Sequence, residues 1–298
     1  MALLKRVAPL AGPLLMGYLF FRYLRPGELL AVFGGASLPL LSLSLGLSAL
    51  LMLGKIHRLQ TLLGREGARV RFLPLARGYA VANLVGQFSN LLVSDLVNAA
   101  SLMADGRRKG AVAAVFLFNR ACDLASILLL ALVLAAGQGR LWGLFGVERG
   151  KVLVAAGVAA LAALFWALLR ERVARGARGV LLLASRNWGT ALVYAFFIYL
   201  CYALGALCEA RALGMGVSWG YLLITFLLGS LVTVAPVSVA GIGTRDLLFV
   251  FLLRLAGATP EAAVALSSLG FLLLPSLSLC LIYLVSVLGE RYEAMLHR

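Results

Sequence analysis

The sequence predicts an all-α integral membrane protein made of two inverted repeats, each with three membrane spans and one re-entrant helical hairpin. The chain is 62% hydrophobic and only 13% charged, whereas a soluble domain has about 25% charged residues. Several apolar runs approach the roughly 20 residues that a helix needs to cross a bilayer. Clusters of Arg and Lys recur between these runs, and such clusters mark the cytoplasmic side of a membrane protein.

The first two spans are expected at residues 8–24 and 29–54, with a turn at 25–28 between them. A basic pair precedes the first span, as in a signal peptide. No small-residue cleavage site follows it, so we expect an uncleaved span. The next segment, 55–77, interleaves Arg and Lys with Leu and Ile. This pattern is typical of an amphipathic segment on an anionic membrane surface.

Residues 78–103 are apolar but contain many polar groups. On a helix, Ser94, Asp95 and Asn98 share one face, and Asn90 precedes them. An Asp in such a run is costly unless it faces a partner or water. Because the basic cluster Arg107 to Lys109 follows, the segment must return to the cytoplasm, and a re-entrant hairpin does this.

A third span is expected at 110–136 and a fourth at 152–170, joined by a loop. The third span contains Asn119, Arg120 and Asp123. Arg120 and Asp123 are three residues apart and can pair on one helix face. The sequence leaves open whether this pair is a structural ion pair or binds substrate.

A second basic surface segment follows at 170–186. A span at 188–210 then ends near Glu209, which we expect at the membrane interface. The last span, 262–288, is expected to break at Pro275 and to place the C-terminus in the cytoplasm.

The remaining apolar stretch, 218–256, must then leave and return on the outer face, as a second hairpin opposed to the first. Ordinary spans in place of both hairpins would give a competing topology, with Arg107 to Lys109 outside.

The stretch 233–250 is the least helix-like part of the apolar sequence. It contains a proline, two glycines and two adjacent charges, together with a serine: Pro236, Ser238, Gly241, Gly243, Arg245 and Asp246. Irregular backbone at membrane depth is tolerated only where protein buries it or where it lines a wet cavity. We expect a helix to start near Thr244 and to offer free N–H groups to an anion. A helix–loop–helix at the membrane surface is the alternative.

The chain is therefore expected to be a single polytopic domain over 1–298, with repeats at about 1–149 and 150–298. Broken helices that meet near the midplane of inverted repeats are a feature of transporters. The sequence similarity between the halves is weak. Val93 to Leu96 resembles Val237–Ser238 joined to Asp246–Leu247.

Several function classes are disfavoured. The net charge of +15 is explained by the positive-inside rule, so we expect no nucleic-acid partner. The two histidines lie in basic segments, and the four cysteines are spaced as apolar filler. We therefore expect no metal site and no cofactor. A nucleotide-binding glycine loop is absent from the sequence.

The motifs resemble those of the flippase-like membrane proteins, the family of the transmembrane domain of lysylphosphatidylglycerol synthase. The stretch Pro236 to Asp246 is similar to the family's second-half motif, Pro-x-Ser-x-Gly-Gly-hydrophobic-Gly-x-Arg-Glu. Ser89 to Asn98 is similar to its first-half motif, and Asn119 to Asp123 to its Glu-Arg-x-x-Asp element. The chain departs from the pattern in having Asn98 where an Arg is usual, and Asp246 in place of Glu.

The resemblance implies translocation of a lipid. Because the chain ends soon after its last span, we expect no aminoacyl-transferring domain. The leading hypothesis is a flippase for a phospholipid or a polyprenyl-linked lipid in the cytoplasmic membrane, with both termini cytoplasmic. The expected headgroup site contains the following residues: Asn90, Ser94, Asp95, Asn98, Asn119, Arg120, Asp123, Ser238, Gly241, Gly243, Arg245 and Asp246.

Two other hypotheses remain open at this point. The protein could be a membrane enzyme acting on a lipid-linked phosphate or sugar, although no catalytic constellation is visible in the sequence. It could also be a non-transporting scaffold. The 32 glycines are compatible with a homo-oligomer, because glycine allows close packing within or between protomers.

Overall fold

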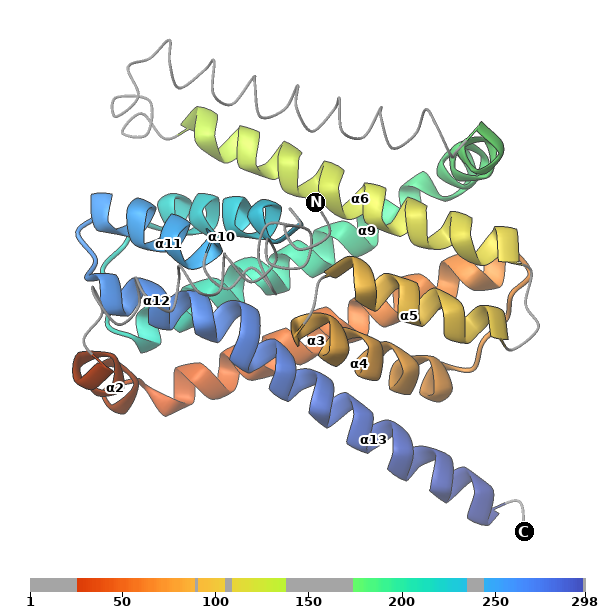
Figure 1. The fold of residues 1–298 in the computed structure, drawn as a ribbon, viewed down its shortest axis with the longest axis horizontal. Coiled ribbons are helices and arrows are strands. Elements are labelled where there is room, and N and C mark those ends of the chain that lie inside the picture. The colour runs from red at the N-terminus through yellow and green to blue at the C-terminus, as the bar shows by residue number, and fades with distance from the viewer. Residues whose placement is uncertain (1–25, 89–90, 105–108, 138–173, 235–243, 297–298) are drawn as a thin grey trace, which may run out of the picture.

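The computed structural model describes residues 26–88, 91–104, 109–137, 174–234 and 244–296. Every regular element in these ranges is a helix (Figure 1). Four stretches of the described chain are long and apolar enough to cross a membrane: Leu38–Arg65, Gly110–Ile127, Asn187–Ala212 and Pro260–Met295. They agree with four of the six predicted spans, whereas the spans predicted at 8–24 and 152–170 lie outside the described residues.

Helices α3 (Leu38–Arg65) and α9 (Ala174–Ala212) form the antiparallel centre of the fold. The Ser37 N–H donates to the Ala212 carbonyl at 3.0 Å where α3 starts and α9 ends. At the other end, Arg65 donates to the Asn187 side chain at 2.5 Å. The two helices therefore run side by side in opposite directions over most of their shared length.

The second span starts and ends later than predicted. A short helix α2 (Pro26–Gly34) precedes it, and α3 continues through the segment predicted to lie on the membrane surface. Ile56, Leu59, Leu62 and Leu63 are completely buried, and so is Arg58. The surface interpretation of this part was wrong because its apolar face packs against the other helices, not against lipid headgroups.

Helices α4 (Phe72–Phe88) and α5 (Leu91–Ala104) pack against each other as a helical pair. Gly86 permits their close approach, because a Cβ at this position would lie 2.6 Å from the Ser94 Cβ. Arg77 at the start of α4 pairs with Glu290 of the last helix. The open end of this first helix pair therefore lies at the same end of the molecule as the C-terminal helix (Figure 1).

A second helix pair, α10 (Trp219–Val234) and α11 (Thr244–Leu255), lies at the opposite end of the molecule (Figure 1). The described part of α11 begins at Thr244, where a helix start was predicted, and the residues just before it lie outside the described ranges. Helix α10 contacts both α5 and α6 (Lys109–Gly137), so the two helix pairs meet inside the molecule. Each pair contributes to its own hydrophobic cluster.

The last span is a continuous helical rod with a local change of winding. It consists of α12 (Pro260–Ser268), a π-helical turn η1 (Leu269–Leu273) and α13 (Leu274–Leu296). Pro275 lacks an N–H, and its ring would clash with the carbonyl oxygen of residue 271 in a regular α-helix. The wider turn immediately before Pro275 accommodates the proline, so the helix does not break there as predicted.

Apolar side chains cover the outside of the long helices. On α9 they recur every four residues, as Leu192, Phe196, Leu200 and Leu204, each more than a third exposed. An exposed apolar stripe of this length is suited to contact with lipid tails.

Candidate functional site: a polar cavity between the helix pairs

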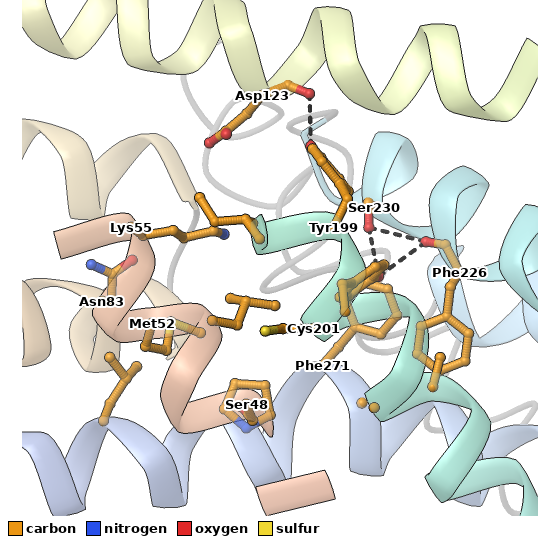
Figure 2. Close-up of a pocket in the computed structure, with 18 of the residues that line it drawn as sticks. Ser48, Met52, Lys55, Asn83, Asp123, Tyr199, Cys201, Phe226, Ser230 and Phe271 are labelled. Atoms are coloured by element: carbon orange, nitrogen blue, oxygen red, sulfur yellow. Dashed lines mark hydrogen bonds between the residues drawn. The ribbon is translucent and has the colours of Figure 1, made fainter. Parts of the chain in front are cut away.

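A cavity of about 200 Å³ lies between the two helix pairs, with walls from α3, α6, α9 and the π-helical turn (Figure 2). Five charged side chains line it: Lys55, Arg120, Asp123, Glu209 and Arg245. Most of the remaining lining is apolar or aromatic. A concave site with a few polar groups on an apolar wall is the usual form of a ligand site.

Asp123 connects three helices at the inner wall of the cavity. Its Oδ1 accepts a hydrogen bond from Arg58 Nη2 of α3 at 2.6 Å. Its backbone carbonyl accepts one from the Tyr199 hydroxyl of α9 at 2.9 Å (Figure 2). The Arg58 side chain is completely buried, and its Nε and Nη1 have no hydrogen-bond partner among the described residues. Asp123 therefore compensates a charge that water does not reach.

Arg120, one turn earlier on α6, pairs with Asp95 of α5. The distances from Asp95 Oδ2 are 2.5 Å to Arg120 Nη2 and 2.8 Å to Arg120 Nε. The sequence placed Arg120 and Asp123 in one intrahelical pair. In the structure, each of them instead bonds to a different helix, Asp123 to α3 and Arg120 to α5 of the first helix pair. Both side chains also line the cavity.

Arg245 occupies the first turn of α11 and is only 3% exposed. Its Nε donates to the Ser267 hydroxyl at 2.9 Å, and its Nη2 lies 3.4 Å from Asp246 Oδ1. Ser267 also donates to Asp246 Oδ1 at 2.5 Å. The guanidinium carbon lies 4.6 Å from the centre of the Phe271 ring, within the range of a cation–π interaction. Asp246 and Ser267 thus orient Arg245, and Asp246 itself does not line the cavity.

Three other predicted site residues, on α5 and α6, do not belong to the cavity lining. Ser94 is 1% exposed and packs against Gly86. Asn98 is 3% exposed, and its Nδ2 has no hydrogen-bond partner in the described part of the chain. The same is true of the Oδ1 of Asn119. None of these three side chains lines the cavity.

Four predicted site residues lie outside the described residues: Asn90, Ser238, Gly241 and Gly243. The structure therefore brings Arg120, Asp123 and Arg245 to one cavity, with Asp95 and Asp246 bonded to the two arginines.

Two charged cavity residues were missed from the sequence. Lys55 was assigned to the surface segment, but α3 continues for ten residues beyond it to Arg65, and Lys55 points into the cavity (Figure 2). Glu209 was assigned to the membrane interface, but it is 5% exposed and lines the cavity. A signal for Glu209 exists in the sequence, because an acidic residue within an apolar run is expensive unless it has a function.

Neutral polar side chains complete the lining. The hydroxyl groups of Tyr202 and of Ser230 on α10 share a hydrogen bond of 2.8 Å (Figure 2). Asn83 and Gln87 reach the cavity from α4, and Ser44 from α3. Among the described residues, no group of His, Cys, Asp and Glu side chains is arranged to hold a metal ion.

The fold and the cavity define a multi-pass helical membrane protein with charged groups inside the membrane-spanning region. The chain belongs to the family described as the lysylphosphatidylglycerol synthase TM region, whose sequence model matches residues 6–281. This confirms the resemblance seen in the motifs and ties the protein to membrane lipids. No curated protein and no solved structure matches the chain.

Proposed function

We propose that the protein is a flippase that moves a lipid with a phosphate-bearing headgroup across the cytoplasmic membrane through the cavity between the helix pairs. The observation that carries the proposal is the lining of this cavity, which contains three basic side chains, Lys55, Arg120 and Arg245, against two acidic ones. An excess of basic groups favours an anionic headgroup. The proposal contains no chemical step, so we expect no enzyme activity.

The arrangement of the paired helices supports re-entrant hairpins. The pair α4–α5 and the pair α10–α11 lie at opposite ends of the molecule (Figure 1), and α10 contacts α5 between them. Hairpins that enter from opposite ends and meet near the membrane midplane are a feature of inverted-repeat transporters.

The distribution of charge supports a cytoplasmic location for one end of the molecule. Arg65, Arg69, Arg71 and Arg77 lie around the link between α3 and α4. Arg65 bonds to Asn187 of α9, and Arg77 pairs with Glu290 near the end of α13. Such clusters face the cytoplasm. The C-terminus, and with it the N-terminus in the proposed topology, would then be cytoplasmic, and α10 and α11 would enter from outside.

The basic side chains differ in how they can hold a phosphate. The Arg245 guanidinium is oriented by Asp246 and Ser267, and a planar guanidinium matches the geometry of phosphate oxygens. The Lys55 ammonium has no hydrogen bond or ion pair within the described residues. It therefore supplies a charge that a headgroup can use without breaking an existing pair.

The test is lipid translocation in proteoliposomes, measured with fluorescent phosphatidylglycerol and bleaching of the outer leaflet. A charged hydrogen bond contributes about 1.5 to 3 kcal/mol, so Arg245→Ala and Lys55→Ala should each slow translocation about tenfold to hundredfold. Arg254→Ala, on the exposed face of the same α11 helix, is the matched control and should stay within about twofold of the wild type.

Competition distinguishes the two lipid classes. Unlabelled phosphatidylglycerol and a polyprenyl phosphate should compete unequally, and the stronger competitor identifies the substrate class. Phosphatidylcholine, whose headgroup has no net charge, should compete weakly. Translocation by the Arg245 and Lys55 variants at the wild-type rate would contradict the proposed site, provided that both variants unfold at the wild-type temperature.

A further inference from the structure

Glu209 is a buried carboxyl group that the proposed headgroup site does not use. It lies on α9, is 5% exposed and lines the cavity. Its Oε1 accepts a hydrogen bond from the Ser44 hydroxyl at 2.8 Å. Its Oε2 is buried and has no hydrogen-bond partner among the described residues.

No basic side chain in the described ranges lies within ion-pairing distance of Glu209. The groups around it come from four elements: Tyr202 and Cys208 from α9, Ser44 from α3, Phe226 from α10 and the glycine at 270 from the π-helical turn. Of the charged cavity residues, Arg245 is held by Ser267 and Asp246, and Lys55, Arg120 and Asp123 approach from α3 and α6.

A carboxylate in such surroundings is unfavourable, because a buried charge without a partner loses its hydration and gains no compensating interaction. The neutral acid avoids this penalty. The observed arrangement therefore suits protonated Glu209, whereas access of water to the cavity would favour its ionisation.

The backbone makes a specific space for this carboxyl group. A Cβ at Gly270 would lie 2.7 Å from Glu209 Oε2 and 2.5 Å from the Phe226 ring. Gly270 belongs to the π-helical turn, and such turns occur frequently at functional sites. The unpartnered oxygen is therefore held in a site shaped by an unusual backbone segment.

We propose that Glu209 binds a proton when the cavity opens to one side of the membrane and releases it to water on the other side, so that a proton gradient drives lipid movement. This inference rests on the proposed lipid transport, and it names the energy source of that transport. The proton moves between water and Oε2, and no other group is oxidised, reduced or transferred.

The first test needs no lipid transport. Dicyclohexylcarbodiimide reacts with protonated carboxyl groups in apolar surroundings, and mass spectrometry locates the adduct in the purified full-length protein. We expect an adduct on Glu209 that decreases as the pH is raised and is missing in Glu209→Gln. Glu261→Gln removes another buried carboxyl group, outside the cavity, and should leave the Glu209 adduct unchanged. Failure to label Glu209 at any pH would overturn the inference.

The second test measures the steady-state distribution of fluorescent lipid between leaflets under a pH gradient. With one proton per lipid, two pH units can sustain an asymmetry of at most about a hundredfold. We expect the asymmetry to follow the gradient in wild-type protein and in Glu261→Gln, and to be lost in Glu209→Gln. Glu209→Asp should retain part of it.

The outcomes separate the two proposals. If the lipid distribution between the leaflets does not depend on the pH gradient, or depends on a sodium gradient instead, the proposed role of Glu209 is wrong. The flippase proposal would remain intact. Wild-type protein that moves none of the lipids tested would contradict the flippase proposal, and with it the coupling role, whatever the labelling shows.

Discussion

At the scale of single residues, the sequence identified three of the five charged groups that line the cavity, but not how they pair. Arg120 and Asp123 were expected to pair because they are three residues apart on one helix. The structure directs Asp123 to Arg58, 65 positions away in the chain, and Arg120 to Asp95. Helical periodicity predicts which side chains share a face, but it gives no information on which other helix that face meets.

The buried pair Arg58–Asp123 gives a prediction for stability. Asp123→Ala leaves the fully buried Arg58 guanidinium without its partner, and such a change costs about 3 to 5 kcal/mol. We expect a clearly lower unfolding temperature in detergent. Asp95→Ala breaks the Arg120–Asp95 pair, in which the Arg120 side chain is 22% exposed and the Asp95 side chain 28%. Because water reaches this pair, its loss should lower the unfolding temperature less.

A double variant checks the cause. Arg58→Met combined with Asp123→Leu replaces both charges by apolar groups and should recover much of the lost stability. If this double variant unfolds as early as Asp123→Ala, the loss does not come from the unpaired charge.

At the scale of the helices, the two helix pairs were predictable because polar and irregular stretches interrupt the apolar sequence at 78–103 and 218–256. The exact ends were not. Lys55 was misplaced because it begins a basic cluster, and the sequence alone gives no measure of how far α3 continues beyond the apolar run. Glu209 was misplaced because it lies beside Arg211 close to the end of its span, where a charged residue is normally at the membrane interface. Helix α9 contains 39 residues, so it is about 58 Å long and exceeds the thickness of a bilayer.

Close packing within the first helix pair depends on Gly86. A Cβ there would meet Ser94 at 2.6 Å, and overpacking of this kind costs about 1 to 3 kcal/mol. We expect Gly86→Ala to lower the unfolding temperature. Gly78→Ala, on the same helix α4, has nothing within 4 Å of the added Cβ and should be neutral or slightly stabilising.

Ser94→Gly in the Gly86→Ala background removes the side chain that the new methyl group would meet. It should restore part of the stability. Equal stability of the two alanine variants would show that the helix pair does not pack as closely as described.

At the scale of the whole molecule, composition and charge predicted an all-helical membrane protein, and the structure and the family membership confirm this. The position of the cavity was not predictable, because its lining combines residues from seven separate elements, α3, α4, α6, α9, α10, α11 and the last helical rod. The inverted relation of the two halves remains a prediction, supported by the position of the two helix pairs at opposite ends of the molecule (Figure 1).

The most direct test of the opposed hairpins is cysteine accessibility in intact cells. The four native cysteines are replaced, and single cysteines are introduced at Lys109, the first residue of α6, and at Ala258, in the link after α11. A membrane-impermeant thiol reagent added from outside should label Ala258→Cys and should label Lys109→Cys only after the membrane is permeabilised. Labelling of Lys109→Cys from outside would show that α4 and α5 cross the membrane, and it would contradict a headgroup path between two opposed hairpins.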